Sequence, residues 1–132
     1  MSRAIIAILG AGLAGWIFGA VWYTVLGKPW QRALGPNPED SKGKKMPMAP
    51  MVASFLVAIV MSAVLYQLLT NLGVLAVTGS AIAGLTIGVG FLATSIVVNN
   101  MFQQKSAMLT IIDAGHWVLA LVIESVVIAL LA

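Results

Sequence analysis

Residues 108–131 read MLTIIDAGHWVLALVIESVVIALL, and this stretch decides what kind of protein the chain forms. A helix of these 24 residues rises about 36 Å, which exceeds the roughly 30 Å hydrocarbon core of a bilayer. Three ionisable side chains interrupt the apolar run, at Asp113, His116 and Glu124. A charged side chain near the bilayer centre costs about 2.5–3.5 kcal/mol on translocon-type scales. Each of the three therefore needs a partner or a purpose inside the membrane.

Three more apolar stretches precede this one, at residues 4–26, 51–69 and 78–98. The chain of 132 residues is 61% hydrophobic and only 8% charged, whereas soluble domains are roughly 25% charged. Only helices and closed barrels satisfy the backbone in lipid, and these stretches lack the alternation of barrel strands. We predict an all-α fold over residues 1–132, a single transmembrane four-helix bundle with a cytoplasmic loop between spans one and two. Because there is no cysteine, disulfides and thiolate metal sites are excluded.

Loop charges predict the orientation of the bundle. One side, formed by residues 27–50 and the short loop after span three, carries six of the seven basic residues, and the other side carries only Arg3. The six are Lys28, Arg32, Lys42, Lys44, Lys45 and Lys105. The positive-inside rule places these loops in the cytoplasm and both termini on the non-cytoplasmic side of the inner membrane. All five prolines lie in residues 29–50, where we expect a loop with one short surface helix around residues 37–40.

The glycines of the first span need an explanation of their own. Residues 10–15, GAGLAG, match the G-x-G-x-x-G pattern of dinucleotide-binding folds, but the apolar run continues to residue 26 and no acid follows at the required distance. We reject a nucleotide site, and because the run exceeds the core of a signal peptide, we expect it to remain as a span. Small residues recur every four positions on spans one and three: Ala7, Ala11, Gly15 and Gly19, and Ser80, Gly84 and Gly88. Such stripes let helices approach closely in lipid, so we expect these spans to pack against each other or across a subunit boundary.

The ionisable residues of span four share one helix face. At 100° per residue, Glu124 lies roughly 20° from Asp113, and His116 falls within an arc of about 80°. Asp113 and His116 lie at the level of polar residues on other spans, which are Tyr23, Asn99 and Asn100. Three interpretations stay open: a structural lock in which Asp113 and His116 pair and bond the two amides, a proton or ion path, and a metal site. One chain supplies too few ligands for a closed metal site, and about 12 Å of apolar helix separates His116 from Glu124, which disfavours a path.

Residues 19–30, GAVWYTVLGKPW, resemble the signature of a family of small bacterial four-span membrane proteins catalogued only as a domain of unknown function. That signature reads approximately Gly-x-x-Trp-Tyr-Ser-Pro, then Phe-Gly-Lys-x-Trp, and its matches here are Trp22, Tyr23, Gly27, Lys28 and Trp30. Residues 99–102 and 112–116 resemble two further segments of the family. Thr24 and Val25 replace the Ser-Pro of the signature, which argues against a proline kink at the end of span one. The resemblance implies four helices in a bacterial membrane and no particular activity.

The sequence predicts no enzyme, because it has no Ser/His/Asp set and no pair of carboxylates within reach of each other. We expect no cofactor, no metal and no nucleic acid; the expected partners are the lipid bilayer and either further copies of this chain or a larger membrane complex. A structural or assembly subunit that docks through its glycine stripes is the favoured function. The alternative is a small proton- or ion-coupled transport unit built on Asp113, His116 and Glu124. The two differ at Glu124, which must line a wet cavity in the transport unit and can stay buried in the structural subunit.

Overall fold

The computed structural model describes residues 2–35 and 48–132, and the regular structure in those two ranges is entirely helical. In chain order the helical segments are α1 (Arg3–Val25), α2 (Gly27–Leu34), α4 (Met48–Asn71), α5 (Val77–Ile87), η1 (Gly88–Ala93), α6 (Thr94–Phe102) and α7 (Ala107–Leu131). In this part of the chain four helices are long and apolar enough to cross a membrane: α1, α4, the continuous run Val77–Phe102, and α7. The predicted all-α, four-span architecture is confirmed. The short helix predicted around residues 37–40 lies outside the described residues.

Two prolines lie inside helices, where the sequence analysis predicts a loop. Pro29 and Pro50 are each the third residue of a helix, α2 and α4 respectively. A proline fits the first turn because the N–H groups there have no partner within the helix. For this reason the second span begins at Met48 instead of residue 51, and the residues after span one form α2. Leu26, with φ −97° and ψ 17°, separates α1 from α2.

Span three contains a turn of π-helix, η1, between α5 and α6. Its first residue, Gly88, lies against α7, where an added Cβ would sit 3.0 Å from the Cα atom of Val118. Gly90, two residues on, faces the opposite way and would have nothing within 4 Å of its Cβ. The span continues to Phe102, past the predicted end at residue 98. Span three therefore presents one glycine to the bundle and another to its surroundings.

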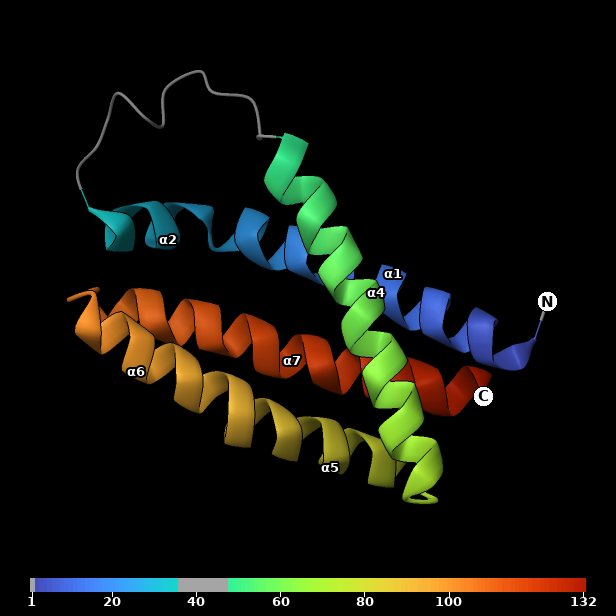
Figure 1. Cartoon of the computed structure of the whole chain (residues 1–132). Helices are drawn as coiled ribbons and strands as arrows, with labels where there is room; N and C mark the ends of the chain where they lie inside the picture. Colours follow the sequence, from blue (N-terminus) through green and yellow to red (C-terminus); the bar gives the residue numbers. More distant parts are fainter. Residues whose placement is uncertain (1, 36–47) are drawn as a thin grey trace.

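Helix α7 is the centre of the bundle and contacts each of the other described helices. Figure 1 shows α1 and α2 along one side of α7 and the α5–α6 run along the other, with α4 crossing α1 obliquely. The two chain ends lie at the same end of the bundle. Helix α1 makes no contact with α5, η1 or α6, because α7 stands between them.

The small-residue stripes of spans one and three both pack against α7. A Cβ at Gly15 would collide with the side chain of Glu124, and a Cβ at Gly84 would lie 2.8 Å from the carbonyl oxygen of Leu121. The prediction that spans one and three pack against each other is therefore wrong within one copy of the chain. Both stripes allow another helix to approach closely, as small residues do in lipid. The helix that approaches is α7 in both cases.

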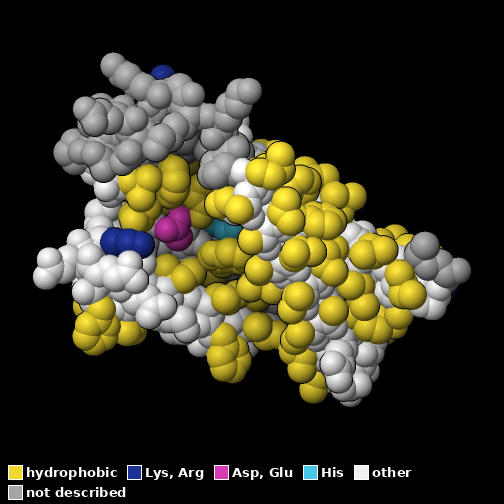
Figure 2. Space-filling view, turned by 45° about the horizontal axis from the view of Figure 1, so that its top comes forward, with side chains coloured by type: hydrophobic (Ala, Val, Ile, Leu, Met, Phe, Trp, Pro, Cys, Tyr) yellow, Lys and Arg dark blue, Asp and Glu magenta, His cyan; other side chains and the backbone are white. Residues whose placement is uncertain are grey.

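An apolar core joins α1, α4 and α7 in the half of the bundle nearer the termini. Its fully buried members are Ala11, Leu65, Leu69, Leu121 and Ile128. Outside this core, hydrophobic side chains also cover much of the face seen in Figure 2. An apolar exterior suits a bundle in lipid, where the surroundings are as apolar as leucine itself.

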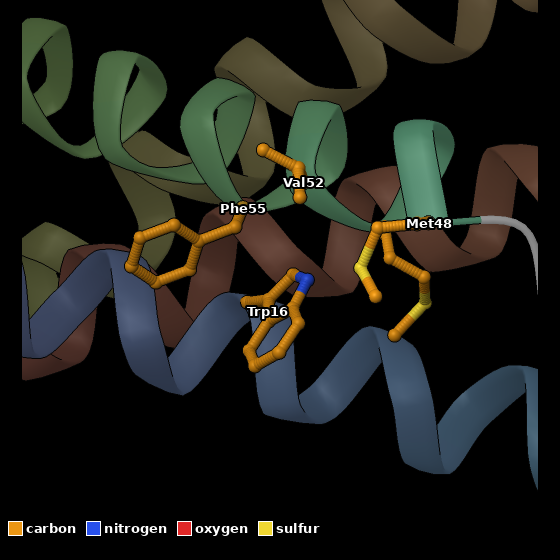
Figure 3. Close-up of a pocket in the computed structure, with 5 residues that line it drawn as sticks. Trp16, Met48, Val52 and Phe55 are labelled. Atoms are coloured by element: carbon orange, nitrogen blue, oxygen red, sulfur yellow. The ribbon is translucent and has the colours of Figure 1, made fainter.

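Helix α4 touches α1 closely at one point and leaves a cleft beyond it. At the crossing, Gly12 lies against the backbone of Ile59, and the Ser62 hydroxyl donates a 2.7 Å hydrogen bond to the carbonyl oxygen of Ile8. Toward the beginning of α4 an apolar cleft of about 440 Å³ opens, lined by Trp16, Met48, Met51, Val52 and Phe55. Figure 3 shows Trp16 extending from α1 toward α4, and its ring lies 5.3 Å from that of Phe55. The cleft is entirely apolar and separate from the ionisable residues of α7.

Candidate functional site

Helices α1 and α7 run antiparallel, and each ionisable residue of α7 meets its own residue of α1. Starting from the end that holds the termini, the contacts are Glu124 with Gly15, His116 with Gly19, and Asp113 with Tyr23. The structure thus places all three on the face of α7 that packs against α1. At the first two positions glycine leaves room for the partner, because the carboxyl or the imidazole occupies the space that a Cβ would fill.

Asp113 accepts its hydrogen bond from Tyr23. The phenolic Oη donates to Oδ1 at 2.6 Å, and both residues are partly buried. The neighbouring Trp22 donates through Nε1 to the carbonyl oxygen of Ile112 at 3.0 Å. Two consecutive side chains of α1 therefore hold two consecutive residues of α7, which sets the height and rotation of one helix on the other. The pairing of Asp113 with His116 that the sequence suggested is replaced, among the described residues, by this bond from Tyr23.

His116 lies in a cluster of aromatic rings. The residue is 9% exposed, and its Nδ1 atom has no hydrogen-bond partner in the described part of the chain. Its ring stacks on Phe18 at 6.0 Å between centroids and lies 5.0 Å from the ring of Tyr23. We call the connected set the aromatic cluster; its members are Phe18, Trp22, Tyr23, Trp30, His116 and Trp117. Figure 2 shows the chain's single histidine and an acidic side chain together in a hollow bordered by hydrophobic groups.

Glu124 is buried among the helices of the bundle. It is 2% exposed, and its Oε2 atom has no hydrogen-bond partner among residues 2–35 and 48–132. Ser125, beside it, is fully buried and its hydroxyl is likewise without a partner there. Between Glu124 and His116, about 12 Å apart along the helix, the residue buried on the same side is Ala120. Glu124 is thus separate from the site of His116 and Asp113, and the polar groups of α7 do not form a continuous polar row.

The two asparagines of span three are divided between different environments. Asn100 is buried and donates from Nδ2 to the hydroxyl oxygen of Thr110 at 3.0 Å, whereas Asn99 is exposed. Neighbouring residues on a helix point about 100° apart, so one amide can face α7 only if the other turns away. Thr110 lies almost one turn before Asp113, and neither asparagine hydrogen-bonds to that carboxylate. The predicted amide partners of Asp113 are therefore not part of its surroundings.

The remaining signature residues lie on α2. Gly27 is the first residue of that helix and has open space around its Cβ position, and Lys28 is exposed. Sequence analysis missed Phe18 and Trp117, whose rings border His116. The sequence offered a signal for both. Phe18 lies one helical turn before the Trp-Tyr pair, and Trp117 directly follows His116. Within the described ranges, no three His, Cys, Asp or Glu side chains are grouped so as to hold a metal ion.

Comparison with known proteins gives a family but no function. Residues 6–129 match the family described as a protein of unknown function, DUF1761. No curated protein and no solved structure matches the chain. The match extends from the first turn of α1 to the last turn of α7, so it includes every contact described above.

Proposed function

This chain belongs to the DUF1761 family, whose description names no activity, and from its geometry we propose that it is a structural, non-enzymatic subunit of the cytoplasmic membrane that assembles with further copies of itself. In this proposal the polar residues of α7 serve to hold α1 in place. Tyr23 and Trp22 position one end of the helix pair, and Glu124 on Gly15 and His116 on Gly19 position the middle.

The observation that carries the proposal is the burial of Glu124 inside the bundle. A proton or ion path needs this carboxyl in a wet cavity, whereas Glu124 is 2% exposed and the apolar Ala120 lies between it and His116. A buried carboxyl at this depth is tolerated when it faces the bundle interior, which is where Glu124 lies.

Self-association is supported by the outer face of span three. Thr86, Gly90 and Thr94 recur every four residues and are all exposed, with open space around Gly90. This forms a second small-residue stripe, facing away from α7, in the span with the smallest buried share of the four. Small residues at this spacing are the common contact surface between membrane helices. A second copy of the chain can present the same face, as two-fold symmetric membrane dimers do.

Assembly is tested by blocking this stripe with bulk. Gly90→Leu should shift the purified protein from oligomer to monomer in detergent, measured by mass photometry or by cross-linking in vesicles. The matched control is Ala53→Leu, which introduces the same leucine side chain at an exposed small residue of α4. A wild-type protein that is monomeric at every concentration would overturn the assembly proposal, and an oligomer unaffected by Gly90→Leu would remove this stripe as its interface.

A second candidate function is proton- or ion-coupled transport, and one observation favours it. Three buried polar atoms have no partner among residues 2–35 and 48–132 and could bond to water or a substrate: Nδ1 of His116, Oε2 of Glu124 and the Ser125 hydroxyl. Proteoliposome flux assays decide between the candidates. The structural proposal expects proton flux no greater than in empty vesicles, for the wild type and for Glu124→Gln alike. A wild-type flux that Glu124→Gln abolishes would establish transport instead.

The orientation we propose, with both termini outside, is tested by single cysteines. The chain has no native cysteine, so Ser2→Cys and Lys105→Cys can be labelled one at a time without background. A membrane-impermeant maleimide applied to intact spheroplasts should label the first and spare the second, and the reverse pattern would invert the orientation.

A further inference from the structure

The carboxylate of Asp113 and the rings around it form a site of a recognisable chemical kind. Asp113 accepts a hydrogen bond at Oδ1 from Tyr23, a member of the aromatic cluster, and Tyr23 and His116 in turn contact Phe18, Trp30 and Trp117. We propose that Asp113 and this aromatic cluster bind a primary organic ammonium group. The proposal concerns a ligand and is independent of whether the protein assembles or transports.

Charge complementarity identifies the ligand as a cation. An ionised carboxylate offers about four lone-pair sites, and Tyr23 occupies one of them. Among residues 2–35 and 48–132, the polar contact of the Asp113 carboxylate is this bond from Tyr23, and no Lys or Arg forms an ion pair with it. The residue is partly buried, which leaves the carboxylate reachable from outside, and Figure 2 shows an acidic side chain beside the histidine in its hollow.

The aromatic rings distinguish an organic ammonium from a metal ion. Six rings are linked to one another at centroid distances of 4.7–6.0 Å, with Tyr23 joining them to the carboxylate, and ring faces attract ammonium groups through their quadrupoles. A metal ion would need further oxygen or nitrogen ligands, and the described residues offer no group of three. A primary ammonium carries three N–H donors, which suit the free lone pairs of the carboxylate. The Nδ1 atom of His116, buried and without a partner among residues 2–35 and 48–132, is a further polar atom in the cluster.

The site lies near one end of the bundle. Asp113 is the seventh residue of α7, about 9 Å from its first residue, and Trp22, Tyr23 and Trp30 lie at the same end of the bundle. Tryptophan and tyrosine favour the level of the headgroups, where the ammonium of an ethanolamine phospholipid is found. A free amine dissolved on that side carries the same group, so the lipid and the soluble amine are two sources of one chemistry.

Binding is measured by native mass spectrometry of the protein released from vesicles of phosphatidylethanolamine, phosphatidylcholine or phosphatidylglycerol, and by tryptophan fluorescence during titration with free ethanolamine. We expect phosphatidylethanolamine to be retained at least tenfold better than phosphatidylglycerol, and phosphatidylcholine to be intermediate because its ammonium has no N–H. Competition by free ethanolamine identifies a soluble amine as a ligand, and its failure to compete identifies the lipid headgroup; both outcomes support the ammonium site. Equal retention of all three lipids would overturn it.

Three variants separate binding from a structural role. Asp113→Asn should weaken phosphatidylethanolamine retention at least tenfold, whereas Tyr23→Phe, which frees a lone pair of the carboxylate, should preserve or strengthen it. If Asp113 and Tyr23 only hold the two helices together, both variants should weaken the fold and neither should change which lipid is retained. Glu124→Gln is the matched control, because it removes the other carboxyl of α7 about 16 Å away. If Asp113→Asn does not fold, Phe18→Leu removes a ring without the charge and should weaken retention several-fold; unchanged retention would overturn the proposal.

Discussion

Replacing Gly84 by alanine tests the central position of α7 most directly. The added Cβ would lie 2.8 Å from the carbonyl oxygen of Leu121 and 3.0 Å from the Cβ of Ser125. A backbone oxygen cannot rotate away, so α5 and α7 must separate by some tenths of an ångström along their shared length. Overpacking of this kind costs about 1–3 kcal/mol, and the higher helix propensity of alanine returns up to about 1 kcal/mol. The expected net loss is about 1–2 kcal/mol of unfolding free energy, or about 5- to 30-fold in the folding equilibrium.

The matched control is Gly90→Ala on the same span. Nothing lies within 4 Å of a Cβ at Gly90, so this variant should keep or slightly raise the stability. Both proteins are unfolded by SDS in mixed micelles, dilute enough to be monomeric, and followed by circular dichroism. Equal stabilities of Gly84→Ala and Gly90→Ala would refute the close approach of α5 to α7, and with it the arrangement in which α7 separates spans one and three.

Two further predictions concern single hydrogen bonds between helices. Tyr23→Phe should lower the unfolding free energy by about 1 kcal/mol, because the bond to Asp113 lies near the end of the bundle. A double-mutant cycle with Asp113→Asn should give a coupling free energy of similar size. A coupling of zero would mean that the 2.6 Å bond is not formed in lipid. Ser62→Ala should cost about 0.6 kcal/mol through the lost 2.7 Å bond to the carbonyl oxygen of Ile8, measured in the same SDS titration, and an unchanged midpoint would contradict the crossing of α4 over α1 at this point.

Hydropathy predicts the four spans because the requirement for continuous apolar length is a one-dimensional property of the chain. The helix starts near Pro29 and Pro50 could not be predicted this way, because proline is compatible both with a loop and with the first turn of a helix. The partner of the glycine stripes also escaped prediction. Periodicity shows that a face is built for close approach, and Gly15 and Gly84 do lie in close contacts, but it does not reveal which helix lies opposite.

The candidate site was predictable at the level of one helix and no further. The 3.6-residue period puts Asp113, His116 and Glu124 near one direction, which needs no tertiary information. Which groups meet them depends on how far α1 slides along α7, and a shift of one residue changes the partner. That is why Tyr23 rather than an asparagine bonds Asp113, and why the ring of Phe18 beside His116 was missed.

The order of the helices along the chain has a consequence for biogenesis. Spans one and three both make their most extensive contacts with α7, yet α7 is synthesised after them. Before residue 107 is synthesised, α1 can pack against α4. Span three then has only its small contact with α4, and the glycines that later face α7 are exposed to acyl chains. The newborn protein thus passes through a three-span stage that is inserted but unassembled, and that stage is the one most open to membrane proteases and insertion chaperones.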